Sequence, residues 1–145
     1  MKTCKVVTAF IVKGDRVLIL RRSSKVGSYK GRWSGISGYL EDLPLRQAYK
    51  EIWEELSISG KDLQLLAIGN PVEVVDDDLE VRWIIYPFLF RFVGEDHKIK
   101  LDWENIEAKW VKPEEIKRFK TVPDLYRVLK NVWNKAYPPH KNEDK

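Results

Sequence analysis

The sequence predicts an α/β (α+β) fold, in which short strands alternate with two longer helices. Two runs rich in β-branched residues, 5–12 and 16–21, flank a turn at Gly14 and predict an antiparallel hairpin. Residues 44–56 carry apolar side chains with helical spacing, which predicts an amphipathic helix. The length of 145 residues suits one compact domain, which we expect over 1–137, followed by a flexible tail over 138–145.

The middle of the chain has the pattern of two long strands. Residues 63–75 and 80–92 are rich in β-branched and aromatic residues, and the acidic turn 76–78 separates them. Proline lacks the N–H that a central strand needs. Pro87 therefore predicts that the second strand lies at a sheet edge or contains a bulge.

The C-terminal third predicts one strand and two helices. Residues 106–111 alternate in polarity, and the side chains expected to face inward are Ile106, Ala108 and Trp110. A short helix is expected over 113–119 and a longer one over 122–136. The buried side of the longer helix is expected to carry Leu125, Tyr126, Leu129, Val132 and Trp133.

The residues around 44–56 carry signals for the two ends of that helix. Asp42 is expected to cap the N-terminus, and Pro44 suits the first turn. Ser57 and Gly60 mark the exit.

The composition excludes several classes of protein. With 43% hydrophobic and 33% charged residues the chain is typical of a globular protein, and its net charge of +4 favours anionic ligands. No recognised nucleic-acid-binding module is present. The first 20 residues contain neither a transmembrane span nor a signal-peptide core, so we expect a cytoplasmic protein without a membrane partner. The single cysteine, Cys4, can form no internal disulfide.

Three carboxylates crowd one face of the predicted helix 44–56. Glu51, Glu54 and Glu55 follow at i, i+3 and i+4, and the spacing of Glu51 and Glu55 is unfavourable for two like charges. A hard divalent cation such as Mg²⁺ would compensate them, because it prefers carboxylate oxygens and shares its coordination sphere with phosphates. The alternative is a solvated acidic face, partly neutralised by Lys50 and Arg46.

The segment around these carboxylates resembles a known motif. Gly38, Glu41 and the run KEIWEELSI at 50–58 are similar to the Nudix box, GX5EX7REUXEEXGU. The resemblance implies a Nudix-like α/β/α sandwich with a mixed central β-sheet, the Nudix helix and a C-terminal helix. It covers most of the chain, although only KEIWEELSI is specific.

This sequence departs from the family pattern at four places. Lysine replaces arginine at Lys50, serine replaces glycine at Ser57, Ser37 stands where glycine is usual, and the connection to the helix is about two residues short. The place of the family's first glutamate is therefore either unfilled or taken by Asp42 or Glu41. Lys50 can still hold a carboxylate, but without the planar fork of arginine.

The resemblance also implies the roles of individual residues. Mg²⁺, with Mn²⁺ as a substitute, is expected on Glu51, Glu54, Glu55 and the backbone carbonyl of Ser37. Glu51, Glu54 and Glu104 are the expected catalytic residues. Glu104 is the first candidate for a base contributed by a later loop and Glu107 is the second, but an ordinary loop carboxylate explains Glu104 equally well.

Basic and aromatic residues supply candidates for substrate binding. A cluster of cations precedes the box and comprises Arg21, Arg22, Lys25, Lys30 and Arg32. We expect Arg21, Arg32 and Lys50 to contact the substrate, with Arg21 as first choice for the phosphates. Trp33 and Trp83 could stack a base, but core positions are favoured for both.

The expected function is hydrolysis of a pyrophosphate bond in a nucleoside diphosphate linked to another moiety, such as a nucleoside triphosphate, a dinucleoside polyphosphate or a nucleotide sugar. The partner is thus a nucleotide-like small molecule rather than nucleic acid, and homodimer formation is left open. One alternative is a non-catalytic nucleotide sensor. A less favoured one is an isopentenyl diphosphate isomerase-like enzyme, because Cys4 lies far from the box.

Overall fold

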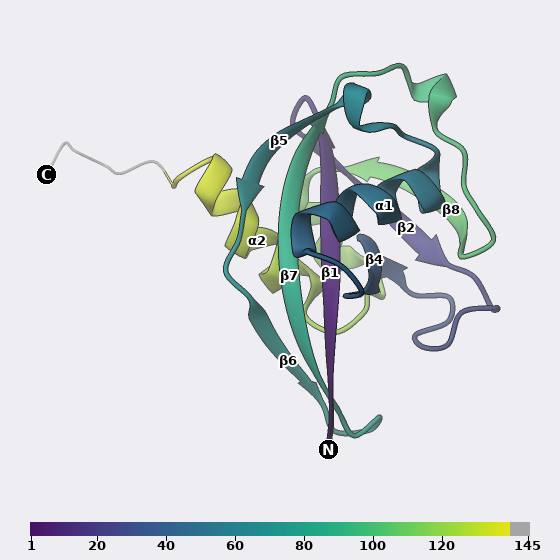
Figure 1. Ribbon diagram of the computed structural model, residues 1–145, viewed down its shortest axis with the longest axis vertical. Coiled ribbons are helices and arrows are strands. Elements are labelled where there is room, and N and C mark those ends of the chain that lie inside the picture. Colours follow the sequence, from purple (N-terminus) through teal and green to yellow (C-terminus); the bar gives the residue numbers. More distant parts are fainter. Residues whose placement is uncertain (140–145) are drawn as a thin grey trace, which may run out of the picture.

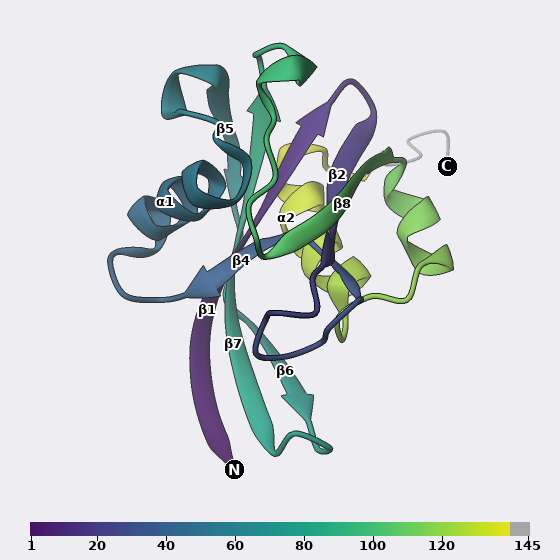
Figure 2. The ribbon, with the colours of Figure 1, turned by 90° about the vertical axis from the view of Figure 1, so that its right-hand side faces the viewer.

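The centre of the fold is a parallel pair of long strands, β1 (Lys2–Lys13) and β7 (Val81–Phe92). They align residue by residue from Lys2 opposite Val81 to Val12 opposite Arg91 in the computed structural model, which describes residues 1–139. All the other strand pairs are antiparallel, so the sheet is mixed. The helices α1 (Pro44–Leu56) and α2 (Leu125–Ala136) cover its opposite faces (Figures 1 and 2), which confirms the expected α/β/α sandwich.

Two strands share the edge of β1 that faces away from β7. The hairpin with β2 (Arg16–Arg22) forms as expected and pairs the end of β1, Val12 and Lys13. The earlier part, from Val6 to Ala9, pairs instead with β4 (Ile36–Tyr39). The short β3 (Trp33–Ser34) pairs with β2. Because β2 and β4 use different parts of β1, they leave an opening between them.

The single strand expected over 63–75 is wrong, because it is two strands. β5 (Leu63–Ile68) and β6 (Val72–Asp76) both pair with β7 but at different positions along it. The break falls at Gly69, where a Cβ atom would lie 2.5 Å from Asn131 Oδ1 and 2.7 Å from Pro87 Cγ. Gly69 is therefore packed closely between Pro87 of β7 and Asn131 of α2, where a larger residue would not fit.

Pro87 does not mark an edge strand, because β7 has partners on both sides. It lies opposite the break between β5 and β6, and its carbonyl accepts a hydrogen bond from Gly69 N–H. In a strand the N–H and C=O of one residue point to the same side. The N–H that proline lacks would therefore point at the break between β5 and β6, so no hydrogen bond of the sheet is lost there.

The C-terminal elements follow the predicted order, but side-chain orientation and helix type differ, and the last helix begins at Leu125 rather than at 122. β8 (Asn105–Val111) pairs with β2, but Ile106 is 61% exposed rather than inward. The short helix η3 (Pro113–Arg118) has 3₁₀ geometry. The fully buried residues of α2 are Leu125, Val128, Leu129 and Val132, whereas Tyr126 and Trp133 are partly buried. Two further 3₁₀ turns are η1 (Gly60–Asp62) and η2 (Asp96–Lys98).

The ends of α1 differ from the expectation at the N-terminus. Leu43, not Asp42, is the N-cap, and no side chain caps the helix; Asp42 accepts a hydrogen bond from Leu43 N–H instead. Pro44 occupies the first turn as expected, and the helix ends at Ser57 in the left-handed conformation, with φ 59°. Its apolar stripe, including Ala48, Ile52 and Leu56, packs on one face of the sheet, and α2 packs on a second cluster.

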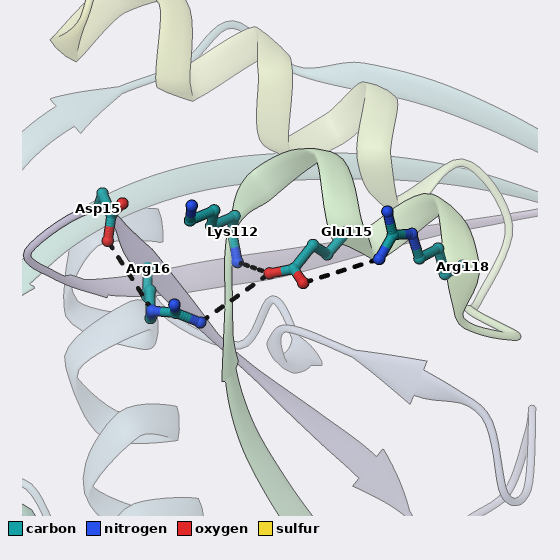
Figure 3. A network of polar contacts seen from close by, with 5 residues as sticks. All are labelled: Asp15, Arg16, Lys112, Glu115 and Arg118. Atoms are coloured by element: carbon teal, nitrogen blue, oxygen red, sulfur yellow. Dashed lines mark hydrogen bonds and ion pairs between the residues drawn. The ribbon is translucent and has the colours of Figure 1, made fainter.

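An exposed polar network connects the β1–β2 turn to η3 (Figure 3). Arg16 lies 3.9 Å from Asp15 and 4.0 Å from Glu115, which also accepts a 2.7 Å hydrogen bond from the N–H of Lys112 and lies 4.0 Å from Arg118. Ion pairs this exposed contribute at most about 1 kcal/mol each. The network therefore orients the turn rather than holding the fold together.

The end of the chain is described only in part. Residues 138 and 139 follow α2 without regular structure, and the rest of the expected flexible tail, 140–145, lies outside the described residues. Within 1–139 neither α-helix combines the length and hydropathy needed to cross a lipid bilayer.

Candidate functional site

A cavity of about 390 Å³ lies where β2 and β4 separate. One part of its wall is polar and carries Arg22, Glu51, Glu54 and Glu104. Another part is apolar and aromatic, and its lining residues include Val6, Tyr39, Val74, Trp83 and Ile85. The cavity thus combines charged and apolar walls, as small-molecule sites do.

Glu51 is held on the inner side of α1 against the backbone of β4. Its carboxylate packs on Gly38 so closely that a Cβ atom at residue 38 would lie 2.2 Å from Glu51 Cδ. Gln47, one turn earlier, donates a 2.7 Å hydrogen bond to Glu51 Oε2 and accepts one from Glu41 N–H. Burial, opposed by that hydrogen bond, raises the pKa of Glu51 to about 7.

Glu55 is the most deeply buried carboxyl of the site, with 3% of its surface exposed. One oxygen accepts a 3.0 Å hydrogen bond from Asn105 Nδ2, and the other, Oε2, has no hydrogen-bond partner. Burial and the charge of Glu104 raise the pKa of Glu55 well above its ordinary value. An unpaired buried carboxylate oxygen is costly, so this position favours a cation or a proton.

Glu104 and Arg22 come from chain segments distant from α1. Arg22 ends β2, and its Nε donates to Ser28 O at 3.0 Å. Glu104 stands just before β8, and its backbone carbonyl accepts a hydrogen bond from Ser23 N–H. Burial raises the pKa of Glu104 and lowers that of Arg22. These two side chains add one positive and one negative charge to the cavity that α1 lines.

The structure brings some of the predicted site residues together and leaves others apart. Ser37 and Glu54 line the cavity with Glu51 and Glu104, and Glu55 lies behind them. The three cations expected at the substrate do not line it. Arg21 donates to Gly31 O and lies 3.8 Å from Glu107, Arg32 donates to Thr121 O, and Lys50 is exposed. Substrate contacts by these three cations remain predictions.

The sequence did not single out Gln47, Asn105 or Tyr29 as site residues. Gln47 lies one helical turn before Glu51, and this i, i+4 spacing could have identified it as a partner of Glu51. Asn105 and Tyr29 reach their partners across 50 and 54 residues, so no local pattern relates them. Trp33 fills the core as favoured, at 8% exposed, whereas Trp83 lines the cavity.

The residues present fit a divalent cation. Among residues 1–139 no group of three or more acidic, histidine or cysteine side chains converges to form a ready coordination site. However, Glu51 and Glu55 are buried, both have raised pKa values, and one oxygen of Glu55 is unpaired. Arg22 is the only cationic side chain that lines the cavity within the described part of the chain. Uncompensated carboxylates of this kind are the oxygen ligands that Mg²⁺ and Mn²⁺ prefer.

Comparison with solved structures shows the same fold in proteins of distant sequence. The MutT protein of Methanosarcina mazei Go1 is 26% identical, covers 87% of this chain and 88% of its own, and has a TM-score of 0.71. A NUDIX hydrolase of Nitrosomonas europaea is 18% identical over 99% of this chain and 100% of its own, with a TM-score of 0.76.

A third similar structure is a bifunctional NMN adenylyltransferase/ADP ribose pyrophosphatase of Francisella tularensis, complexed with AMP and manganese ion. It is 16% identical over 92% of this chain and 42% of its own, with a TM-score of 0.71. The search of curated proteins gave no match. The family model for the NUDIX domain matches residues 2–132, and the chain, which has the Nudix hydrolase fold, therefore belongs to this family.

Proposed function

We propose that this protein is a Mg²⁺-dependent hydrolase that cleaves a pyrophosphate bond in a nucleoside diphosphate linked to another moiety. The observation that carries the proposal is the buried Glu55, whose Oε2 has no partner although Glu51 and Glu104 contribute further negative charge. Members of the family are typically hydrolases, and one structure with this fold contains AMP and manganese ion. The protein would act on small nucleotides in the cytoplasm, without nucleic acid or membrane; a homodimer remains open.

In this proposal the carboxylates of Glu51, Glu54 and Glu55 and the carbonyl of Ser37 hold the cation. When bound, the cation lowers the pKa of water and neutralises charge on the phosphates. Gln47 keeps the carboxylate of Glu51 directed toward the cavity through its 2.7 Å hydrogen bond. Asn105 of β8 donates a 3.0 Å hydrogen bond to Glu55 Oε1, which links the helix to the sheet at the site.

Glu104 is the proposed base, and Arg22 is the proposed phosphate ligand. The raised pKa of Glu104 suits a carboxylate that accepts a proton from the attacking water at its side-chain oxygen. Arg22 lines the cavity and carries the only positive charge among its lining residues within 1–139. Its guanidinium can therefore bind the phosphate oxygens left exposed by the cation.

Chromatographic detection of the cleavage products over a panel of nucleoside triphosphates, dinucleoside polyphosphates and nucleotide sugars tests the proposal, because hydrolysis of a dinucleoside polyphosphate or a nucleotide sugar gives two phosphate esters and no inorganic phosphate. We expect cleavage that requires Mg²⁺ or Mn²⁺ and is abolished in Glu55→Gln, while that variant stays folded in metal-free buffer with at least the parent's stability. Glu95→Gln, at an exposed carboxylate outside the cavity, is the matched control and should retain activity. A destabilised but active Glu55→Gln protein would contradict the assignment.

The same assay decides between this proposal and the sequence-based alternatives. A non-catalytic sensor would bind nucleotides with Mg²⁺ but form no cleavage products from any member of the panel. The isomerase-like alternative needs a cysteine at the reacting atoms, and Cys4 does not line the cavity.

A further inference from the structure

The apolar wall of the cavity is one continuous face of four neighbouring strands. Trp83 and Ile85 lie two residues apart on β7, so their side chains share a face. Val74 of β6 is the register partner of Trp83, and Val6 of β1 is the partner of Ile85. Tyr39 of β4 is in turn the partner of Val6. Five side chains therefore form a floor on the face of the sheet that α2 covers, and this floor lines the same cavity as Glu51 and Glu54 of α1.

The two aromatic rings of this floor lie next to each other. The ring centroids of Tyr39 and Trp83 are 6.4 Å apart with an angle of 35° between the planes. A planar ligand between two parallel rings needs about 7–8 Å, twice the contact distance of carbon atoms. The rings are also tilted, so they offer a surface for stacking on one side rather than a slot. Tyr39 is 60% exposed, which leaves its ring accessible from the opening.

A chain of two hydrogen bonds holds the indole ring of Trp83 in place through its N–H. Its Nε1 donates to the hydroxyl of Tyr29 at 3.0 Å, and that hydroxyl donates to Asp76 Oδ2 at 2.6 Å. Burial and the hydrogen bond to Asp76 raise the pKa of Tyr29 to about 12, so the phenol keeps its proton. The indole N–H is thereby engaged in a hydrogen bond within the protein. Trp83 can therefore offer a ligand its ring but not this donor.

The three aliphatic floor residues also lack groups that could recognise the edge of a base. Val6, Val74 and Ile85 have no polar side-chain atoms, and the nearby hydroxyls of Thr8 and Ser37 bond to each other at 3.1 Å. A base that is recognised by its edge requires fixed donors and acceptors, whereas stacking accepts every base because each has a π face.

We propose that Tyr39 and Trp83 form a subsite that binds a purine-sized planar ring by stacking, with Tyr29 and Asp76 as positioning residues for Trp83. The subsite selects by ring area and does not distinguish adenine from guanine. This inference rests on the proposed function, because it assigns the ring of the nucleotide to the apolar wall and its phosphates to the acidic wall.

Calorimetric binding of four probes in the presence of Mg²⁺ tests the subsite without turnover: AMP, GMP, ribose 5-phosphate and pentyl phosphate. One-sided stacking contributes about 1–3 kcal/mol per base, which corresponds to roughly 5- to 150-fold in affinity. We expect AMP and GMP to bind within about threefold of each other and about tenfold more tightly than ribose 5-phosphate. A tenfold preference between the two purines, pentyl phosphate binding as tightly as AMP, or no binding of AMP at millimolar concentration would each overturn the proposal.

Three variants test which residues account for the tighter binding of purine nucleotides. Trp83→Leu should reduce the affinity for AMP to that for ribose 5-phosphate and leave the latter unchanged. Tyr39→Ala removes an exposed ring whose loss should not impair folding. It should lower the affinity for AMP severalfold and leave the affinity for ribose 5-phosphate unchanged. Tyr29→Phe keeps the ring but removes the hydroxyl, so it should weaken both purine nucleotides and spare ribose 5-phosphate, which general destabilisation would not do. If Tyr39→Ala lowered the affinity for all four probes by the same factor, the subsite would be refuted.

Chromatographic detection of nucleotide cleavage separates failure of the subsite from failure of the proposed function. Mg²⁺-dependent cleavage of nucleotides without selective purine binding would support the hydrolase and refute the subsite. Selective purine binding without cleavage of any nucleotide would support the subsite and favour the non-catalytic sensor over the hydrolase.

Discussion

Glu51→Gln in metal-free protein should remove a pH-dependent loss of stability. The folded-state pKa of Glu51 is about 7 against an ordinary value of 4.5, a difference of about 2.5 (7 − 4.5). At 1.36 kcal/mol per unit this corresponds to at most about 3.4 kcal/mol. The cavity admits water, which screens the charge, so we expect about 1–2 kcal/mol.

The sign follows from the protons bound in each state. Between pH 4.5 and 7 the folded protein keeps a proton on Glu51 that the unfolded chain has lost, so the free energy of unfolding falls as the pH rises through this window. Glutamine cannot ionise, yet it keeps an oxygen for Gln47 and nearly the same shape against Gly38. The parent and the variant should therefore diverge between pH 4.5 and 7, with the variant more stable above pH 7.

Urea unfolding at several pH values in EDTA measures this difference. Glu95→Gln is the control, and its curve should follow the parent's within about 0.5 kcal/mol. Parallel curves for the parent and Glu51→Gln would refute the argument that burial holds Glu51 protonated. Added Mg²⁺ at ten times its dissociation constant should then stabilise the parent by about 1.4 kcal/mol, and Glu51→Gln by less.

Three further predictions concern the neighbours of this carboxylate and the end of α1. Gly38→Ala should lower Mg²⁺-dependent turnover at least about tenfold, because the new Cβ displaces the carboxylate of Glu51; unchanged rates would contradict this. Gln47→Leu should cost about 1–3 kcal/mol in urea unfolding by leaving Glu51 Oε2 unpaired, and an equally stable variant would show that water replaces the amide. Ser57→Gly should raise the free energy of unfolding in urea by about 1 kcal/mol, since φ is 59° there; a lower free energy would disprove strain at this residue.

The sequence by itself determined the local elements and the acidic helix. The 3.6-residue period of 44–56 predicted the amphipathic helix α1, and the i, i+3 and i+4 spacing placed Glu51, Glu54 and Glu55 on one face. The period did not predict that Glu51 and Glu55 are buried while Trp53 is 57% exposed. The hairpin at Gly14 and the helix before the C-terminus followed from equally local signals. These features depend on residues close together in the chain, where periodicity and turn chemistry act directly.

Only the tertiary structure decided how those elements meet. It divided 63–75 at Gly69, because Pro87 and Asn131 occupy the space beside that glycine, and it placed Pro87 in a central strand. It also brought Asn105 to Glu55 across 50 residues. Contacts of this kind depend on which strand pairs with which and on how closely the elements pack, and no short window of sequence contains that information.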